Sequence, residues 1–166
     1  MAALRERLPG RAIEMLFVNA GIINSNEMAP IGEVSTEEFI RVMVTNALCP
    51  MRVIESFQDL VAADVLIGVM SSGQGNVSNN TAGMREVYRG SKAALNRFMR
   101  SYAARNPESP RAMVLMAPGW VRTELGGPDG RLSIGESVPN LVNVLLGKQG
   151  RAGLEYLDYL GRTAPW

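Results

Sequence analysis

Short apolar runs alternate along the chain with longer segments in which apolar residues recur every three or four positions. Residues 13–18, 64–70 and 112–117 are nearly continuously apolar, which is typical of strands buried on both faces of a parallel sheet. A shorter run at residues 153–157 predicts a fourth strand. Because helical periodicity separates these runs, the pattern predicts an α/β fold with a parallel sheet and helices on both faces.

Two of the expected helices begin with a Ser-x-x-Glu capping box, at Ser35 and at Ser133. The spacing predicts helices over residues 36–61 and 133–146. The apolar stripe expected on the second helix consists of Val138, Leu141, Val142 and Leu145.

The helix over residues 36–61 contains an internal proline, Pro50. Proline has no amide hydrogen and its ring clashes with the carbonyl four residues earlier, so we expect a kink and a free carbonyl at Asn46. A further long helix is expected over residues 86–105, and a short one over residues 2–8 is expected to stop at Pro9-Gly10.

Composition narrows the possible functions. The 166 residues are 46% hydrophobic, which predicts one domain over residues 1–166. With 17 Lys and Arg against 16 Asp and Glu, the chain has no net field to attract nucleic acid or an anionic membrane, so a small molecule or a protein is the expected partner. One cysteine and no histidine exclude multi-cysteine metal sites and histidine triads. Without a leader or a membrane-length run, we expect a cytoplasmic protein.

Tyr88 and Lys92 stand four residues apart at the start of the helix over residues 86–105, so they share a face. An ammonium near a phenol can lower its pKa by up to about three units, although this spacing alone fits an ordinary surface pair better. Ser71 and Ser72 follow the second strand, at the sheet edge where parallel sheets bind ligands.

Five short motifs occur in the order in which a known enzyme family has them. They are Asn19-Ala20-Gly21, Asn46, Ser72, the Tyr88 and Lys92 pair, and Pro118-Gly119-Trp120-Val121-Arg122-Thr123. Together they resemble the C-terminal two thirds of a short-chain dehydrogenase/reductase, whose fold is a doubly wound, Rossmann-type parallel sheet. The long loop over residues 73–87 and the chain end over residues 158–166 are closest to the carbonyl-reductase and C-factor-like branch.

The resemblance implies hydride transfer between NAD or NADP and a carbonyl or alcohol substrate. In that chemistry Tyr88 exchanges the proton, Ser72 holds the substrate oxygen, Lys92 lowers the Tyr88 pKa and binds the ribose, and Asn46 binds a relay water. The residues implied in cofactor binding are Asn19, Ala20, Gly21, Tyr88, Lys92, Pro118, Gly119, Val121 and Thr123. Those expected to border the substrate pocket are Met84, Arg85, Trp120, Leu125 and residues 126–132.

The sequence departs from the family because the Gly-rich phosphate turn and the first strands are absent. We therefore expect weak cofactor binding, and an exposed edge on the strand over residues 13–18. A second copy, a separate polypeptide or residues 1–12 could cover this edge. A homo-oligomer is expected through the helices over 36–61 and 86–105, through this strand, or through both. The alternative function is a catalytically silent module for binding or dimerisation.

Overall fold

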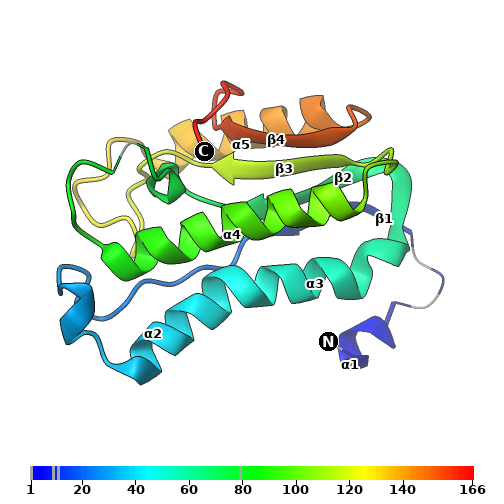
Figure 1. Ribbon diagram of the computed structural model, residues 1–166. Helices are drawn as coiled ribbons and strands as arrows, with labels where there is room; N and C mark the ends of the chain where they lie inside the picture. The colour runs from blue at the N-terminus through cyan, green and yellow to red at the C-terminus, as the bar shows by residue number, and fades with distance from the viewer. Residues whose placement is uncertain (1, 9, 11, 79) are drawn as a thin grey trace.

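The computed structural model describes residues 2–8, 10, 12–78 and 80–166, and it contains one four-stranded sheet. The strands are β1 (Ile13–Val18), β2 (Val61–Met70), β3 (Ala112–Ala117) and β4 (Gly153–Asp158). All neighbouring strands are parallel and their order in the sheet follows the chain, β1-β2-β3-β4 (Figure 1). The predicted parallel α/β architecture is confirmed.

Strand β2 begins earlier than the apolar pattern predicts. Val61 is buried and pairs with Ile13 of β1, whereas the sequence suggested that it ends the preceding helix. That helix in fact ends at Phe57, and a 3-10 turn, Gln58–Leu60, leads directly into the strand. The register between β1 and β2 shifts between Ile13 and Met15, so the pairing at Val61 is separated from the main ladder by an irregularity.

The predicted kink before Pro50 is present as a π-helical turn. Helix α2 (Thr36–Met43) continues through the π-helical residues Val44–Leu48 into helix α3 (Cys49–Phe57), whose first turn contains Pro50. Asn46 lies inside the π-helical turn. Because Pro50 has no amide hydrogen to donate to the Asn46 carbonyl four residues earlier, the regular hydrogen-bond pattern is interrupted here.

Helices cover the two faces of the sheet unequally. Helices α3 and α4 (Glu86–Arg105) pack on one face and α5 (Ile134–Lys148) on the other (Figure 1). The capping box at Ser133 is complete. Leu141 and Leu145 of α5 are buried, but the other two members of its predicted stripe are exposed to 44% at Val138 and 43% at Val142. Only one side of α5 faces the sheet, so the buried apolar stripe of this helix is narrower than the sequence predicts.

The N-terminal helix α1 (Ala2–Arg5) does not lie along the sheet. It is shorter than the predicted helix, whose expected stop at Pro9 falls outside the described residues. Arg5 pairs with Asp59 and donates to the carbonyl of Ser56, so α1 sits beside the end of α3 (Figure 1). Among the described residues, β2 is the only strand paired with β1, whose outer edge is therefore open. In the ranges of the chain that the structure describes, no helix is both long and apolar enough to cross a membrane.

Candidate active site

The carboxyl ends of three parallel strands bring the predicted site segments to one edge of the sheet. Asn19 follows β1, Ser71 follows β2 and Pro118 follows β3. Because neighbouring strands run in the same direction, the segments that leave them emerge side by side. Helix α4 begins over this edge and supplies Tyr88 and Lys92 from its first two turns.

Ser72 lies in a tight turn directly against α4. Its hydroxyl oxygen accepts a hydrogen bond from the amide of Gln74 at 3.1 Å, and the Ser72 side chain lies close enough to the Tyr88 phenol to lower the pKa of that phenol. The turn can approach α4 closely because Gly75 has no side chain, and a Cβ there would lie 3.0 Å from the backbone carbonyl carbon of Lys92. The structure therefore brings the side chains of Ser72 and Tyr88 close together at this edge.

Tyr88 and Lys92 share a face of α4, with the Lys92 ammonium 5.8 Å from the centre of the Tyr88 ring. The expected lowering of the Tyr88 pKa is nevertheless wrong for this structure. Burial raises the pKa of Tyr88, and the opposing influences come from the hydrogen bond to Ser72 and from Arg85. Burial makes the charged phenolate unfavourable because it loses its contact with water, and this effect on the pKa is larger than that of the neighbouring groups.

The Lys92 ammonium is itself buried and partly committed. It donates a hydrogen bond to the carbonyl of Met70 at 2.9 Å, and only 2% of the residue is exposed. Burial lowers the pKa of Lys92 to about 8. An ammonium has three donors, so two remain for other acceptors after the bond to Met70.

Asn46 is fully buried, and its amide ties the segment after β1 to α4. Its Oδ1 accepts from the amide of Ile22 at 2.8 Å, while its Nδ2 donates to the carbonyl of Ile22 at 2.8 Å and to the hydroxyl of Ser91 at 2.9 Å. A Cβ on Gly21 would lie 3.3 Å from the Lys92 ammonium and 3.6 Å from Asn46 Oδ1. The glycine therefore lets the backbone approach two polar groups closely, and the relay role of the Asn46 carbonyl stays a prediction.

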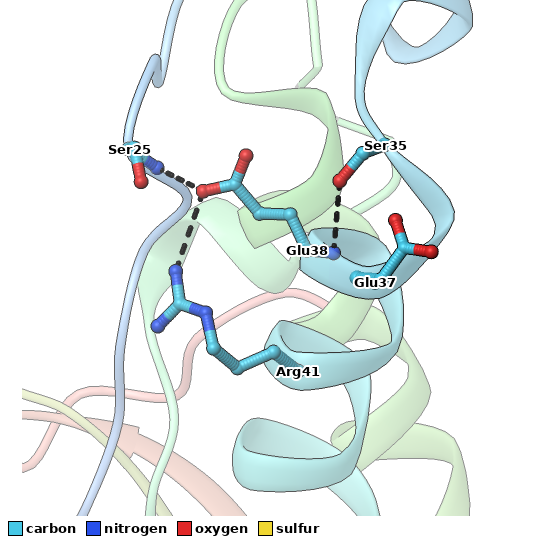
Figure 2. Close-up of a pocket in the computed structure, with 5 residues that line it drawn as sticks. All are labelled: Ser25, Ser35, Glu37, Glu38 and Arg41. Atoms are coloured by element: carbon cyan, nitrogen blue, oxygen red, sulfur yellow. Dashed lines mark hydrogen bonds and ion pairs between the residues drawn. The ribbon is translucent and has the colours of Figure 1, made fainter.

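Helix α2 holds the loop that follows this segment. The Glu38 carboxylate accepts from the amide of Ser25 at 2.5 Å and from Arg41 at 3.3 Å, and Figure 2 shows these contacts beside the Ser35 cap. The Ser35 hydroxyl caps the helix by accepting from the Glu38 amide at 3.2 Å. The prediction that the Glu38 side chain completes the capping box is wrong, because this carboxylate accepts from the amide of Ser25. The hollow in Figure 2 contains none of the predicted catalytic residues.

The segment after β3 folds into a loop that satisfies many of its own hydrogen bonds. Gly119 adopts φ +81°, a left-handed conformation that favours glycine. The indole of Trp120 donates to the carbonyl of Gly126 at 2.7 Å, and the Thr123 hydroxyl accepts from the Gly126 amide at 3.0 Å. Thr123 thus stabilises its own loop, and cofactor contacts from Pro118, Gly119, Val121 and Thr123 stay predictions.

Arg85 connects the two loops that flank the site. It forms an ion pair with Glu27 at 2.9 Å, and the neighbouring Glu86 accepts from the amide of Ile31 at 3.3 Å. Arg85 has φ 60°, an uncommon conformation for a residue with a side chain. Met84 beside it is exposed. The loop before α4 is therefore fixed to the loop after β1, next to Tyr88.

Sequence reasoning missed two residues that touch this site. Ser91 donates to the carbonyl of Tyr88 at 2.7 Å and accepts from Asn46, and Tyr156 of β4 donates to the backbone carbonyl of Ser72. Ser91 is three residues after Tyr88 in α4, and this helical spacing puts the two residues on the same face, so the sequence could have predicted its contact with the site. No local signal marks Tyr156, which is separated from Ser72 by 84 residues.

Comparison with known proteins agrees with this geometry. A family model described as short chain dehydrogenase matches residues 1–131. The chain belongs to the short chain dehydrogenase family. The resemblance inferred from the five motif segments is thereby confirmed, together with the Rossmann-type fold.

The relatives of this family member differ in the share of their own length that the chain covers. The C-signal protein of Myxococcus xanthus is 33% identical over 156 residues, which cover 93% of each chain. A short-chain dehydrogenase/reductase structure from Burkholderia multivorans with bound NADP is 65% identical, with a TM-score of 0.97 over 99% of this chain and 71% of that one. A Pseudomonas aeruginosa carbonyl reductase in complex with NADP is 32% identical, with a TM-score of 0.90 and the same coverages.

Proposed function

We propose that this chain carries the catalytic part of an NAD(P)-dependent oxidoreductase that interconverts a small carbonyl compound and its alcohol. The observation that carries the proposal is the convergence of Ser72, Tyr88 and Lys92 at the carboxyl edge of the sheet, with Asn46 behind them. A nicotinamide cofactor, when bound, supplies or accepts the hydride. Membership of the short chain dehydrogenase family and the NADP held by two structural relatives support this assignment.

The chain's own groups are suited to the proton half of that reaction. Burial keeps the Tyr88 phenol protonated at neutral pH, so it can donate a proton to a carbonyl oxygen held by the Ser72 hydroxyl. Below its pKa of about 8, Lys92 is a buried cation with donors left for a ribose hydroxyl. Its charge would favour proton release from Tyr88 once a bound substrate changes the surroundings of the phenol.

The residues present fit the nicotinamide end of a dinucleotide better than the phosphate end. The backbone at Gly21 lies close to the Lys92 ammonium and to Asn46 Oδ1, which are polar partners for a ribose or a carboxamide. For the pyrophosphate, the sequence offers no Gly-rich turn that opens a helix. We therefore propose that the chain alone binds NADPH or NADH weakly.

Fluorescence titration of the purified chain with NADPH and NADH tests the proposal, with Tyr88→Phe measured beside it. We expect saturable binding in both proteins and carbonyl reduction only in the unsubstituted chain. No binding at millimolar cofactor, or equal turnover in the two proteins, would contradict the proposal for this chain. Tyr102→Phe is the matched control, because this buried tyrosine donates to Gln58 at 2.7 Å and belongs to a different part of α4.

A second function is favoured by one specific comparison. The C-signal protein matches this chain over 93% of both lengths, and its name describes a signal and not a dehydrogenase. We propose as the alternative that the fold serves as a binding or dimerisation module without turnover. A folded chain that binds no cofactor but forms a stable complex with itself or another protein would favour this alternative.

Self-association is part of both proposals. The outer edge of β1 is open among the described residues, and Ile40 of α2 and Phe98 of α4 are exposed to 52% and 42%. We propose that a second copy covers one of these surfaces, since exposed strand edges and apolar side chains favour pairing. Sedimentation of a monomer at all concentrations would contradict this. A cytoplasmic location stays a prediction.

A further inference from the structure

The turn that carries Ser72 is held by a tyrosine from the far edge of the sheet. Tyr156 lies on β4, and its hydroxyl donates to the backbone carbonyl of Ser72 at the end of β2. Strand β3 lies between these two strands, so the phenol reaches past the end of a complete strand. Tyr156 is 1% exposed, which means that water cannot replace its hydrogen bond.

Further polar contacts fix the same turn from other directions. The amide of Ser71 donates to the carbonyl of Met116 on β3 at 2.8 Å. The Ser71 hydroxyl donates to Asn96 Oδ1 on α4 at 2.5 Å, and both side chains lie close enough to the Tyr156 hydroxyl to lower its pKa. Asn96 Nδ2 donates to the carbonyl of Gly75 at 3.4 Å. Residues 71–75 are therefore tied to β3, β4 and α4 at once.

The ring of Tyr156 is held in turn by the end of the chain. The ring of Trp166 packs against it with 5.4 Å between ring centres and an angle of 53°. The Arg100 guanidinium of α4 lies 4.6 Å from the centre of the Trp166 ring. This packing holds the Tyr156 ring between the sheet and the Trp166 ring, with its hydroxyl on the Ser72 carbonyl.

We propose that Tyr156 is a positioning residue that holds the Ser72 turn in the orientation in which the Ser72 hydroxyl meets the Tyr88 phenol. Tyr156 does not touch the reacting atoms in this proposal. It acts through the carbonyl of Ser72, whose side chain lies beside the Tyr88 phenol and lowers the pKa of that phenol. The catalytic consequence rests on the proposed function, whereas the positioning itself can be measured without turnover.

The experiment uses the full chain labelled with ¹³C at the ζ carbon of tyrosine. The four tyrosines give four resonances, and the position of the Tyr88 signal at neutral pH reports the polar groups around its oxygen. Ser72→Ala supplies the reference position for a Tyr88 that has lost the neighbouring Ser72 hydroxyl. Arg85 and Lys92, the other charged groups near Tyr88, are unchanged in every variant.

In Tyr156→Phe we expect the Tyr88 signal to move toward its position in Ser72→Ala. Tyr102→Phe is the control, because it removes the hydroxyl of another buried tyrosine and should leave the Tyr88 signal in place. A folded Tyr156→Phe protein with an unmoved Tyr88 signal would overturn the proposal. If that variant does not fold, Trp166→Leu releases the ring from its stacking partner and should move the Tyr88 signal in the same direction.

Turnover gives the second measurement. We expect Tyr156→Phe to lower kcat about ten- to hundredfold with little change in the KM for the cofactor, because a misplaced group acts mainly on the chemical step. A loss confined to KM would contradict the proposal. If the unsubstituted chain has no turnover, the proposed function fails, and the Tyr88 signal still decides whether Tyr156 positions Ser72.

Discussion

Lys92 offers the most direct physical test of the site, because its ammonium is buried without a carboxylate partner among the influences on its pKa. Burial lowers that pKa from 10.5 to about 8. Between these values the unfolded chain holds a proton that the native chain has released, so the native state gains stability as the pH rises. The full difference corresponds to about 3 kcal/mol, of which about 2 kcal/mol is gained by pH ~9.5.

Urea unfolding between about pH 7 and pH 9.5 measures this gain, with Lys92→Met as the reference that cannot titrate. Tyrosines and all other groups titrate in both proteins, so their contributions cancel in the difference between the two unfolding free energies. Loss of the bond to Met70 lowers the stability of the variant by an amount that does not change with pH. We expect the difference to grow in favour of the unsubstituted chain above pH ~8. A difference that stays constant over this range would refute the reasoning.

Four further substitutions test the packing, the cap of α2 and the Asn46 contacts by urea unfolding. Gly68→Ala should lower the free energy of unfolding by about 1–3 kcal/mol, because its Cβ would lie 2.7 Å from Phe17 and 2.9 Å from Val114. Gly90→Ala should raise the free energy of unfolding by about 0.5–1 kcal/mol, because a Cβ there would have no atom within 4 Å. Equal changes in the unfolding free energy of the two variants would contradict the close packing of Gly68 in β2. Ser35→Ala should lose about 1 kcal/mol through the cap of α2, and an unchanged midpoint would show that the cap contributes nothing. Asn46→Leu should cost at least about 2 kcal/mol by leaving both backbone groups of Ile22 without their partner, and a neutral effect would argue against the clamp.

The sequence by itself determined the elements and the order of the site segments. Six-residue apolar runs at β1 and β3 form strands at the predicted positions, and Pro50 produces the kink around Asn46 because it lacks an amide hydrogen. Both serine caps are present. These features depend on residues a few positions apart, so a single sequence is enough to predict them. Parallel pairing then puts the segments after the strands at one edge.

Tertiary structure decided which of these groups are buried and what they contact. Burial raises the Tyr88 pKa against the influence expected from a nearby cation, and it reverses the sequence-based expectation. Glu38 turns to the amide of Ser25, 13 residues away, instead of completing its own capping box. The bond from Tyr156 to Ser72 spans 84 residues. Dehydration and long-range hydrogen bonds depend on which elements pack together, so the chemistry of the tyrosine and the serine is set by the assembled sheet and not by the motif that contains them.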